Sequence, residues 1–535
     1  DQAPRLRRVL GLRVAEPERE RPAALEAYDK ARGLMRRMRN EEAERAFARA
    51  ARLAREGEEL ECKARLQRAQ MVMRQRDRER AAELFDAVAA DCDDPNVRVR
   101  ALYQAGRCFI AAKQAREAIR VFEAIERDYA DHSYADDARL RAARCHLRLG
   151  DRERFRELLS SLPDRYPDGD MRGEALWTAA QDALDEDDLE AARGALERYF
   201  ELFPIEYDWY TAGRSGYWLG RVEQLLGDQA SARRHFEHVV TTSPLTFYMT
   251  LAAARLDEIA PGRADEIVAR LAPPGGRVDE RFERRWLDEQ PGLASGTELM
   301  RLGLTTRGRR ELRRLIRDSR TPPELHLIVA AVLRRMGVYT DSAALAAASP
   351  ESWRRRYPSG DDLERWTLAY PDAYREEVER AAAKSGVPPA LVWAVMREES
   401  GFNARVESWA NAVGLMQLIL PTARSMGRQL GLRRVNRRTL RDPETNIRLG
   451  AAYLGYLWER FDGRAPLVVA GYNAGEGAVG GWVEERSGEP IDRFVERIPY
   501  QQTRGYTKRV LSSYATYLFL YGEGRTVFRP RPNVP

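Results

Sequence analysis

Two adjacent carboxylates, Glu398 and Glu399, stand at the end of an apolar segment, VPPALVWAVMREESG, at positions 387–401. Its apolar residues recur at helical spacing, and Pro388 and Pro389 precede them, as is typical of a helix start. A carboxylate at the inner end of a buried helix loses hydration, which raises its pKa and lets it hold a proton near neutral pH. Such a group can protonate a leaving oxygen, so the segment predicts a general acid.

The composition of the C-terminal region excludes most other catalytic groups. Residues 371–535 contain no His and no Cys, which excludes a Ser–His–Asp triad, a Cys nucleophile and an ordinary His-based zinc site. No phosphate-binding glycine loop opens a helix there. Carboxylates remain for acid–base chemistry, and we expect neither a cofactor nor a metal.

Four sequence blocks follow one another over about the last third of the chain. They are Glu399-Ser400, Gly414-Leu415-Met416-Gln417, Ala470-Gly471-Tyr472-Asn473-Ala474-Gly475, and Ile498-Pro499-Tyr500 with Thr503-Arg504-Gly505-Tyr506. One block alone could occur by chance, but together, in this order and spacing, they resemble the soluble lytic transglycosylases of the bacterial periplasm. The resemblance implies an all-α protein with a helical-repeat arm, a linker and a lysozyme-like (goose-type), mainly α catalytic domain. It also implies cleavage of the β-1,4 bond of peptidoglycan between N-acetylmuramic acid and N-acetylglucosamine, which leaves a 1,6-anhydromuramic acid end.

The same resemblance implies a single catalytic carboxylate, whereas most glycosidases use two. The family's acid protonates the leaving oxygen and then acts as base on the sugar's own 6-hydroxyl, so no second carboxylate is needed. Glu399 matches that acid because it precedes Ser400 as the family's acid precedes its Ser. Glu398 lies about 100° around the helix and should point elsewhere. An isolated Glu would more often be a surface group at a helix end, and the other blocks outweigh that interpretation.

Further positions match family residues that surround the substrate. Ser408 matches a contact to the sugar near the acid, and Gln417 matches a residue that hydrogen-bonds the N-acetyl sugar. Tyr472 matches a Tyr whose hydroxyl lies near the acid. We expect Asn473 to shape the turn and Tyr500 to stack on a sugar. The plainer alternatives are a loop Ser and a core aromatic with a solvated hydroxyl.

Two positions differ from the family pattern. Gln502 stands where Glu is usual, before Thr-Arg, and Ile419 stands where Met is usual. If the family's Glu polarises the substrate or tunes the acid, its loss would slow the enzyme or shift its pH optimum. Neither change removes the predicted acid.

Self-similarity at a fixed period marks the N-terminal half. Cys108, Cys145 and Asp182 align at steps of 37 residues, each in a small-residue helix followed by a short turn and a second helix. The pattern resembles degenerate tetratricopeptide repeats, which stack into a curved solenoid because one unit cannot bury its apolar face alone.

The chain is predicted to have four parts. These are an extended segment at 1–21, a repeat solenoid at 22–260, a helical linker region at 261–365 and a catalytic domain at 366–535. Within the last two parts we expect helices at 297–317, 323–336, from about 421, at 443–460 and at 503–520, and at most a small hairpin.

Four cysteines, Cys62, Cys92, Cys108 and Cys145, lie in the N-terminal half and match no metal-binding motif. Cys108 and Cys145 occupy equivalent positions in successive repeats. Such positions tend to lie farther apart than the roughly 7 Å between Cα atoms that a disulfide allows. We interpret the four cysteines as small buried apolar residues.

The formal charge of +6 is concentrated in the C-terminal region, where residues 371–535 hold 24 Lys or Arg and 18 Asp or Glu. Basic surfaces usually bind nucleic acid, but no nucleic-acid motif is present and we expect no such partner. Anionic peptidoglycan strands suit the excess, and an Arg-rich surface without a steering role is the alternative.

Location is inferred from the resemblance. No apolar run approaches the roughly 20 residues that span a bilayer, so no transmembrane segment is expected. The chain starts at Asp1 without an initiator Met, which fits either a mature or a trimmed form, and the resemblance implies export to the periplasm with the signal peptide removed. Membrane association and cell-wall protein partners bound through the repeats are left open.

Two other functions compete with this one. A repeat scaffold whose last domain binds glycan with little or no cutting would fit the repeats and Gln502. A hydrolase on the same fold would need a second carboxylate to hold a water. Glu407 and Glu476 are the only acids inside or beside the blocks, and neither stands at a matched catalytic position.

Replacing Gln502 by Glu restores the carboxylate that the family pattern has at this position. We expect higher activity or a shifted pH profile, measured as release of soluble products from purified peptidoglycan. An unchanged profile would show that position 502 is not electrostatically coupled to Glu399.

Overall fold

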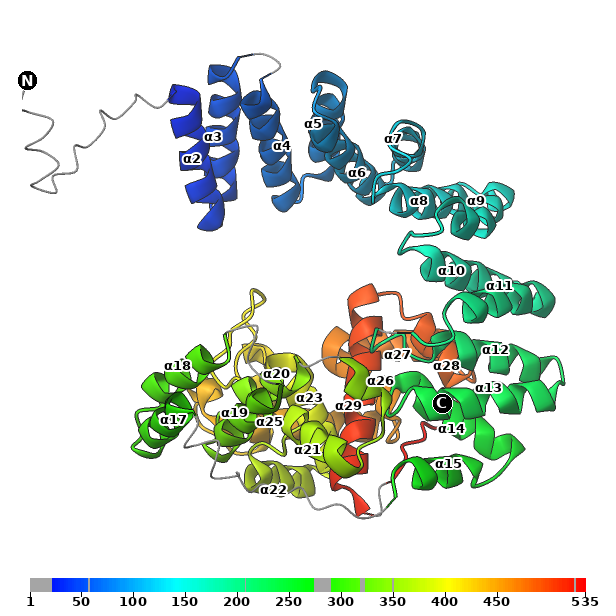
Figure 1. Cartoon of the computed structure of the whole chain (residues 1–535), viewed down its shortest axis with the longest axis vertical. Helices are drawn as coiled ribbons and strands as arrows, with labels where there is room; N and C mark the ends of the chain where they lie inside the picture. The colour runs from blue at the N-terminus through cyan, green and yellow to red at the C-terminus, as the bar shows by residue number, and fades with distance from the viewer. Residues whose placement is uncertain are drawn as a thin grey trace, which may run out of the picture. The chain divides into compact units, whose positions relative to one another are not determined.

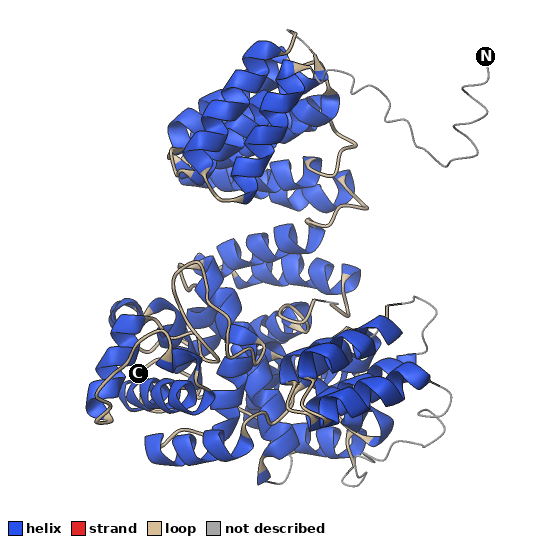
Figure 2. Ribbon diagram, turned by 90° about the vertical axis from the view of Figure 1, so that its left-hand side faces the viewer, coloured by secondary structure: helices blue, strands red, loops and turns tan. Residues whose placement is uncertain are grey.

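The computed structural model describes residues 22–55, 58–206, 208–273, 290–317, 323–348, 351–523 and 526–535. In these ranges the chain forms helices joined by turns and loops, with three isolated β-bridges and no strand (Figure 2). The expected all-α class is confirmed. None of the described helices is long and apolar enough to cross a membrane. The segment expected to be extended, 1–21, lies outside the described residues.

The chain divides into two compact units, Asp1–Ala195 and Leu196–Pro535, with the boundary inside α11 (Leu189–Leu202). The first unit consists of consecutive helices that pack against their neighbours (Figure 1). They are α2 (Ala23–Arg36), α3 (Asn40–Leu53), α4 (Glu59–Arg74), α5 (Arg78–Asp91), α6 (Pro95–Ala111), α7 (Ala115–Asp128), α8 (Ala135–Arg148), α9 (Arg152–Arg165) and α10 (Arg172–Asp185).

The 37-residue period coincides with pairs of helices. Cys108, Cys145 and Asp182 lie in α6, α8 and α10, each the first helix of its pair. Small residues let the two helices of a pair approach closely. A Cβ at Gly106 would lie 2.4 Å from the Phe122 ring, so only Gly fits between α6 and α7 there. The apolar face of one pair is buried against the next, as repeats require.

The cysteines follow the prediction in part. Cys108 and Cys145 are buried and free, as expected. Cys62 and Cys92, however, form a disulfide with their Cα atoms 5.9 Å apart, so the interpretation of these two as apolar core residues is wrong. Cys62 is in α4 and Cys92 caps the end of α5, and these two helices pack against each other. The separation of equivalent positions in successive repeats does not apply to this pair, because Cys62 and Cys92 lie on neighbouring helices.

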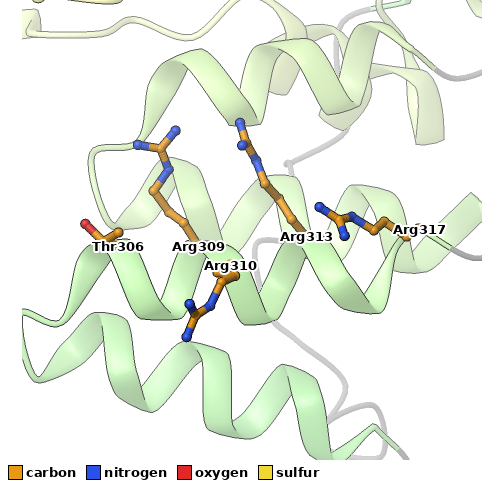
Figure 3. A pocket seen from close by; sticks show the side chains of 5 residues that line it. All are labelled: Thr306, Arg309, Arg310, Arg313 and Arg317. Carbon is orange, nitrogen blue, oxygen red and sulfur yellow. The ribbon is translucent and has the colours of Figure 1, made fainter. Parts of the chain in front are cut away.

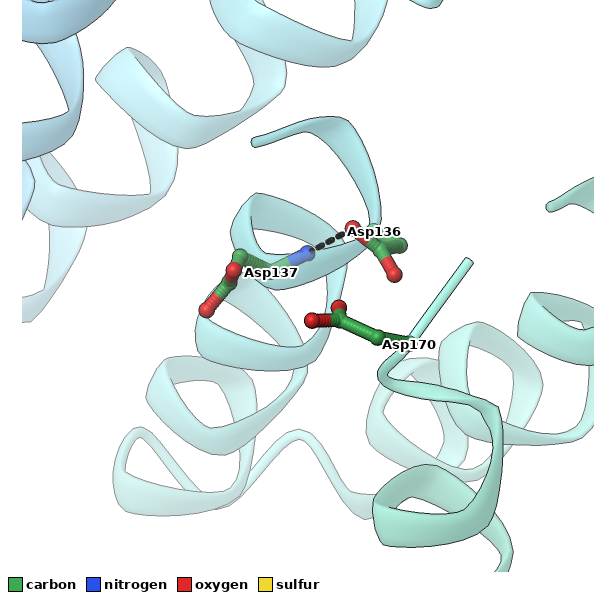
Figure 4. A group of neighbouring side chains, drawn as sticks. All are labelled: Asp136, Asp137 and Asp170. Atoms are coloured by element: carbon green, nitrogen blue, oxygen red, sulfur yellow. Dashed lines mark hydrogen bonds between the residues drawn. The ribbon is translucent and has the colours of Figure 1, made fainter. Parts of the chain in front are cut away.

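Three carboxylates, those of Asp136, Asp137 and Asp170, offer oxygen atoms within 4.8 Å of one another (Figure 4). Asp136 accepts hydrogen bonds from the backbone N–H of Asp137 and, at 3.0 Å, of Met171. Asp137 accepts from the Tyr103 hydroxyl at 3.0 Å. Burial raises the pKa of Asp170. The group joins the turn before α10 to α8, which gives it a structural role within the repeats.

The second unit contains the remaining described helices. Within the range expected for the last repeats lie α12 (Arg214–Leu225), α13 (Gln229–Thr242) and α14 (Phe247–Ile259), and α15 (Arg263–Leu271) follows them. A further group comprises α17 (Pro291–Arg301), α18 (Thr305–Leu315), α19 (Pro323–Arg335), α20 (Tyr339–Ala347), η1 (Glu351–Arg355) and α21 (Gly360–Ala369). The single helix expected at 297–317 is two helices, because Gly303 takes a left-handed φ of 77° and ends α17.

Arginines on α18 connect this helix to α20. Arg309 donates two hydrogen bonds of 2.9 Å to Asp341, and Arg313 donates one of 2.8 Å to the same carboxylate, which is 5% exposed. A cavity of about 350 Å³ beside them is lined by Thr306, Arg309, Arg310, Arg313 and Arg317 (Figure 3). The shared Asp341 explains the position of two of these four guanidinium groups.

The C-terminal helices include those expected from about 421, at 443–460 and at 503–520. They are α22 (Arg375–Ser385), α23 (Pro389–Ser400), α24 (Leu420–Gln429), η2 (Thr439–Arg441), α25 (Pro443–Arg460), α26 (Ala465–Ala474), α27 (Glu476–Glu485), α28 (Ile491–Glu496) and α29 (Gln501–Tyr521). Helix α29 is buried along most of its length and packs against α23, α26 and α14. It therefore contacts both the C-terminal helices and the last repeats.

The disulfide gives a direct test of the fold of the first repeats. Unfolded without reductant, the protein should expose two reactive thiols, and after reduction four. Replacing Cys62 and Cys92 together by Ser should lower the stability of the repeats by roughly 3–4 kcal/mol, because the bond closes a loop of about 30 residues. Four reactive thiols in the unreduced, purified protein would contradict the pairing.

Candidate active site

Glu399 lies in the last turn of α23, and the sequence explains why the helix ends there. The helix begins at Pro389, after Pro388 as its N-cap, and its next seven residues, 390–396, are buried. Gly401 follows with a left-handed φ of 54°, and its N–H bonds to the Arg397 carbonyl. The carboxylate is thereby held where a buried helix emerges into a loop.

Three helices hold the turn 414–417 next to this helix end. From α23, the Ser400 hydroxyl lies 2.7 Å from the Leu415 carbonyl oxygen. From α25, the fully buried Asn446 accepts from the Met416 N–H at 2.8 Å. From α26, the Tyr472 hydroxyl donates to the Met416 carbonyl at 2.8 Å. The turn is thus fixed from several directions.

Gly414 is required by this packing. Its φ of 85° lies in the left-handed region, and a Cβ there would be 2.3 Å from both the Leu440 carbonyl oxygen and the Asn446 side chain. The Asn446 amide also donates to the carbonyls of Val413 and Leu440, at 3.0 and 2.8 Å. Any larger residue at 414 would break the contacts that position the turn.

Glu399 accepts a hydrogen bond of 2.7 Å from the Tyr506 hydroxyl of α29. Burial raises the pKa of Glu399 to about 7, and the charge of Glu398 adds to the rise. The hydrogen bond from Tyr506 and the charge of Arg509 act in the opposite direction. The carboxyl group therefore carries a proton over a range in which an exposed Glu would have lost it.

The neighbouring Glu398 has different partners, as the helix geometry predicts. Its carboxylate accepts from the Ser513 hydroxyl at 2.8 Å and lies 3.4 Å from the Arg509 guanidinium. The Arg397 guanidinium is 3.8 Å away and lies over the Tyr370 ring at 4.2 Å. One carboxylate of the pair is thus bound to charged and polar groups, and the other faces an environment that favours its neutral form.

Besides Tyr472, three of the predicted substrate residues make contacts within the site. The Ser408 hydroxyl accepts from the Ala412 N–H at 3.1 Å, which closes a small hairpin between the bridged residues Glu407 and Val413. The Gln417 amide nitrogen donates to two backbone carbonyls of this loop region, at 3.0 and 3.2 Å. Asn473 accepts from the Thr503 hydroxyl at 2.8 Å, so it joins α26 to α29.

Ile419, Tyr500 and Gln502 are more exposed, whereas the Tyr472 hydroxyl is buried. Ile419 caps the start of α24 with 44% of its surface exposed. Tyr500 precedes α29, is 56% exposed and packs edge-on against the Trp482 ring at 5.3 Å. Gln502 is exposed in the first turn of α29. Tyr472 lies close enough for the Glu399 charge to help raise its pKa, after burial, but its hydroxyl bonds to the turn rather than to the acid.

The two acids considered as second carboxylates are engaged elsewhere. Glu407 forms ion pairs with Arg437 at 2.9 Å and Arg441 at 3.0 Å. Glu476 accepts a hydrogen bond from the Tyr453 hydroxyl at 3.1 Å. The charges that shift the pKa of Glu399 are those of Glu398 and Arg509, and neither Glu407 nor Glu476 is among them. In the part of the chain that the structure describes, potential metal ligands gather only at the repeat aspartates.

Sequence reasoning missed two groups that define this site. Tyr506 was quoted within the last block without a role, although it is the hydrogen-bond donor to the acid. Asn446 lies outside the four blocks. Only the structure reveals its role, because a fully buried amide must find hydrogen-bond partners. Trp409, at the tip of the hairpin, is 88% exposed and was also passed over.

This geometry supports proton transfer by one carboxyl group. The site combines an acid whose pKa lies near neutrality, a hydroxyl donor bonded to it and a rigid turn beside it. A group of this kind can give a proton to a leaving oxygen and then, as a carboxylate, accept one.

Family models match both parts of the chain. The model described as the transglycosylase SLT domain matches residues 376–495. A tetratricopeptide repeat model matches residues 100–132 and 137–169. The two repeat matches start 37 residues apart, which confirms the period found in the sequence.

Similar proteins include several lytic murein transglycosylases. The soluble lytic murein transglycosylase of Escherichia coli K12 is 30% identical over 315 residues, covering 58% of this chain and 44% of that protein. Membrane-bound lytic murein transglycosylase C of Actinobacillus pleuropneumoniae serotype 5b is 31% identical over 171 residues, covering 28% and 46%. The chain thus matches less than half the length of these curated relatives.

Two solved structures share the architecture. An inactive mutant of the lytic transglycosylase Slt from Pseudomonas aeruginosa has a TM-score of 0.59 at 19% identity, covering 100% of this chain and 86% of that chain. The 70 kDa soluble lytic transglycosylase of Escherichia coli has a TM-score of 0.50 at 20% identity, covering 99% and 94%. At these identities the similarity shows a shared fold, which includes both the repeats and the lysozyme-like domain.

The pKa of Glu399 has a consequence for stability. Below pH 4.5 the carboxyl group is protonated in both the folded and the unfolded protein, whereas between about 4.5 and 7 only the folded state keeps the proton. The wild type should therefore lose stability as the pH rises through this range, and Glu399→Gln should not. Above pH 7 the variant should be more stable by up to about 3 kcal/mol, measured by denaturant unfolding.

The matched control is Glu398→Gln, which removes the adjacent carboxylate from its partners Ser513 and Arg509. Its gain at high pH should be much smaller, because burial rather than the charge of Glu398 is the main cause of the raised pKa of Glu399. Equal stability of wild type and Glu399→Gln across pH 4–9 would contradict the environment described for Glu399.

Proposed function

We propose that this chain, which carries an SLT domain and tetratricopeptide repeats and is homologous to the soluble lytic murein transglycosylase of Escherichia coli, is itself a peptidoglycan lytic transglycosylase. It would cut the β-1,4 bond between N-acetylmuramic acid and N-acetylglucosamine and leave a 1,6-anhydromuramic acid end. The observation that carries the proposal is Glu399, a partly buried acid with a pKa of about 7 in the matched position of the domain.

In the proposed reaction Glu399 acts twice. Its proton passes to the glycosidic oxygen as the bond from that oxygen to C1 breaks. The carboxylate then takes the proton of the sugar's 6-hydroxyl, whose oxygen bonds to C1 and closes the anhydro ring. No water is consumed, and a second carboxylate is not needed. Neither Glu407 nor Glu476 is among the charged groups that act on Glu399, which fits this single-carboxylate scheme better than a two-carboxylate hydrolysis.

The surrounding residues would hold the sugar. We assign substrate contacts to Ser408, Gln417, Ile419, Tyr472, Asn473, Tyr500 and Gln502. Gln417 can accept through its amide oxygen, since its nitrogen is bonded within the loop. The exposed faces of Tyr500 and Trp409 offer flat apolar surfaces on which a sugar ring can stack.

Location and organisation follow from the same proposal. The Cys62–Cys92 disulfide supports an oxidising compartment, and we infer the periplasm.

We divide the chain into a solenoid at 22–260, a linker region at 261–365 and a catalytic domain at 366–535. Peptidoglycan glycan strands would be the main partner, and the repeats would offer a surface to cell-wall proteins.

The test is digestion of purified peptidoglycan by the wild type and by Glu399→Gln, with products separated and weighed. Disaccharide-peptides one water lighter than hydrolysis products, absent with the variant, are expected. Full-mass reducing products would show a hydrolase. Bound glycan without products from the wild type would favour the repeat scaffold that binds but does not cut.

A further inference from the structure

Buried polar groups connect the last repeat helices to the end of the C-terminal domain. They come from α12 and α14 on one side and from α28 and α29 on the other, all within the second compact unit. Charged side chains are rarely fully buried unless they are paired, so such a cluster calls for an explanation.

The first group is a closed triangle of three side chains. The Lys508 ammonium donates to the Tyr248 hydroxyl and to the Glu496 carboxylate, each at 2.8 Å. The Tyr248 hydroxyl donates to the other oxygen of Glu496 at 2.6 Å. All three side chains are buried, and burial lowers the pKa of Lys508 while Glu496 opposes that change.

The second group centres on Asp492 of α28, whose side chain is fully buried. It accepts from the Tyr217 hydroxyl at 2.5 Å and from Arg255 at 3.2 Å, and it lies 3.5 Å from Arg221. Tyr217, Arg221 and Arg255 belong to α12 and α14. A third contact joins the Phe247 N–H, at the start of α14, to the Ser512 hydroxyl of α29 at 2.9 Å.

These contacts restrict how the helices can move. Removing one partner of a buried ion pair is costly because the other charge is left without compensation. A slide or rotation of α29 against α14 would separate Lys508, Glu496 and Tyr248 without any water to replace the lost bonds. The triangle therefore fixes the register of α29 relative to the repeats.

The same helix presents its other face to the acid. Tyr506 precedes Lys508 by two residues, which is about 200° of rotation, so the two side chains leave α29 on opposite sides. Tyr506 bonds Glu399, and Lys508 bonds Tyr248 of the repeats. A hydrogen bond of 2.7 Å is lost if its donor moves by about 1 Å, so the register of α29 decides whether this bond exists.

Glu399 lies within the SLT match, but the residues that connect it to Tyr248 do not. The SLT match ends at residue 495, one residue before Glu496 and before the whole of α29. Tyr506 belongs to the last sequence block, but its role as donor to the acid, and the role of Lys508, are assigned from the contacts.

We propose that Tyr248, a residue of the last repeats, is a positioning residue for the acid: through Lys508 and Glu496 it holds α29 in the register in which Tyr506 meets Glu399. The working catalytic unit thus includes α12 and α14. The role proposed for Tyr248 rests on the proposed function of Glu399 as the general acid.

The effect can be read from the protonation of Glu399. The titratable and charged groups that face it are Glu398, Tyr472, Tyr506 and Arg509. The bond from Tyr506 favours the carboxylate, so its loss raises the pKa of Glu399. Since the acid must be protonated to act, the loss of activity on the alkaline side should move to higher pH.

The experiment compares pH–rate profiles of full-length variants on purified peptidoglycan. In Tyr506→Phe the alkaline limb of the profile, where activity falls as Glu399 loses its proton, should lie at a pH higher by roughly half a unit or more. A shift of half a unit changes the ratio of protonated to ionised Glu399 about threefold at a given pH. Tyr248→Phe should move the limb in the same direction by less. The double variant should equal Tyr506→Phe alone, because both changes act through one bond.

Lys508→Met serves as a second variant with the same expectation, and thermal unfolding confirms that each variant is folded. The matched control is Tyr166→Phe, which removes a hydroxyl that donates to Glu126 at 2.9 Å within the first repeats. It should leave the limb unchanged. A limb unmoved by both Tyr248→Phe and Lys508→Met, or additive shifts in the double variant, would overturn the proposal.

A second readout does not depend on activity. The difference in unfolding temperature between each variant and the same variant with Glu399→Gln, followed against pH, changes above the unfolded pKa of Glu399 and levels off at its folded pKa. The pH at which the difference levels off should rise in Tyr248→Phe even if the wild type releases no product, which would refute the proposed function alone. An unchanged levelling-off pH would refute the positioning role alone.

Discussion

The site depends on one hydrogen bond, from the Tyr506 hydroxyl to the carboxyl group of Glu399, at a helix end largely withdrawn from water. Burial favours the protonated acid and the Tyr hydroxyl favours the carboxylate, so the group is balanced near neutrality and can both give and take a proton. Everything around it maintains that balance: α23 ends at Gly401 and delivers the acid, and α29 delivers the hydroxyl.

The two helices are held by different means. The end of α23 is tied through Ser400 to the turn 414–417, which Asn446 and Tyr472 hold from α25 and α26. Helix α29 is tied on its far side to the repeats by buried charges. This arrangement gives the repeat region a structural part in the chemistry, in addition to the binding surface that stacked repeats usually offer.

Local patterns in the sequence predicted much of this. The prolines before α23, the period of 37 residues and the apolar spacing around Glu399 are short-range signals, and helix α25 matches its expected range of 443–460. What could not be predicted are pairings between distant segments. Tyr506 is 107 residues from Glu399 and Lys508 is 260 residues from Tyr248, and no local pattern reports such contacts. The Cys62–Cys92 disulfide was missed for the same reason, because it joins two helices through their packing.

The pH dependence of kcat/KM for the wild-type chain on purified peptidoglycan tests the central claim most directly, because it reports the acid in the free enzyme. If a single acid with a pKa of about 7 controls the alkaline side of this profile, kcat/KM should be unaffected by its ionisation below pH 6 and should fall tenfold for each pH unit above about 7. An alkaline limb near pH 4.5, the value of an exposed Glu, would contradict the account, because the burial and the Tyr506 contact would then have no net effect on the group that does the chemistry.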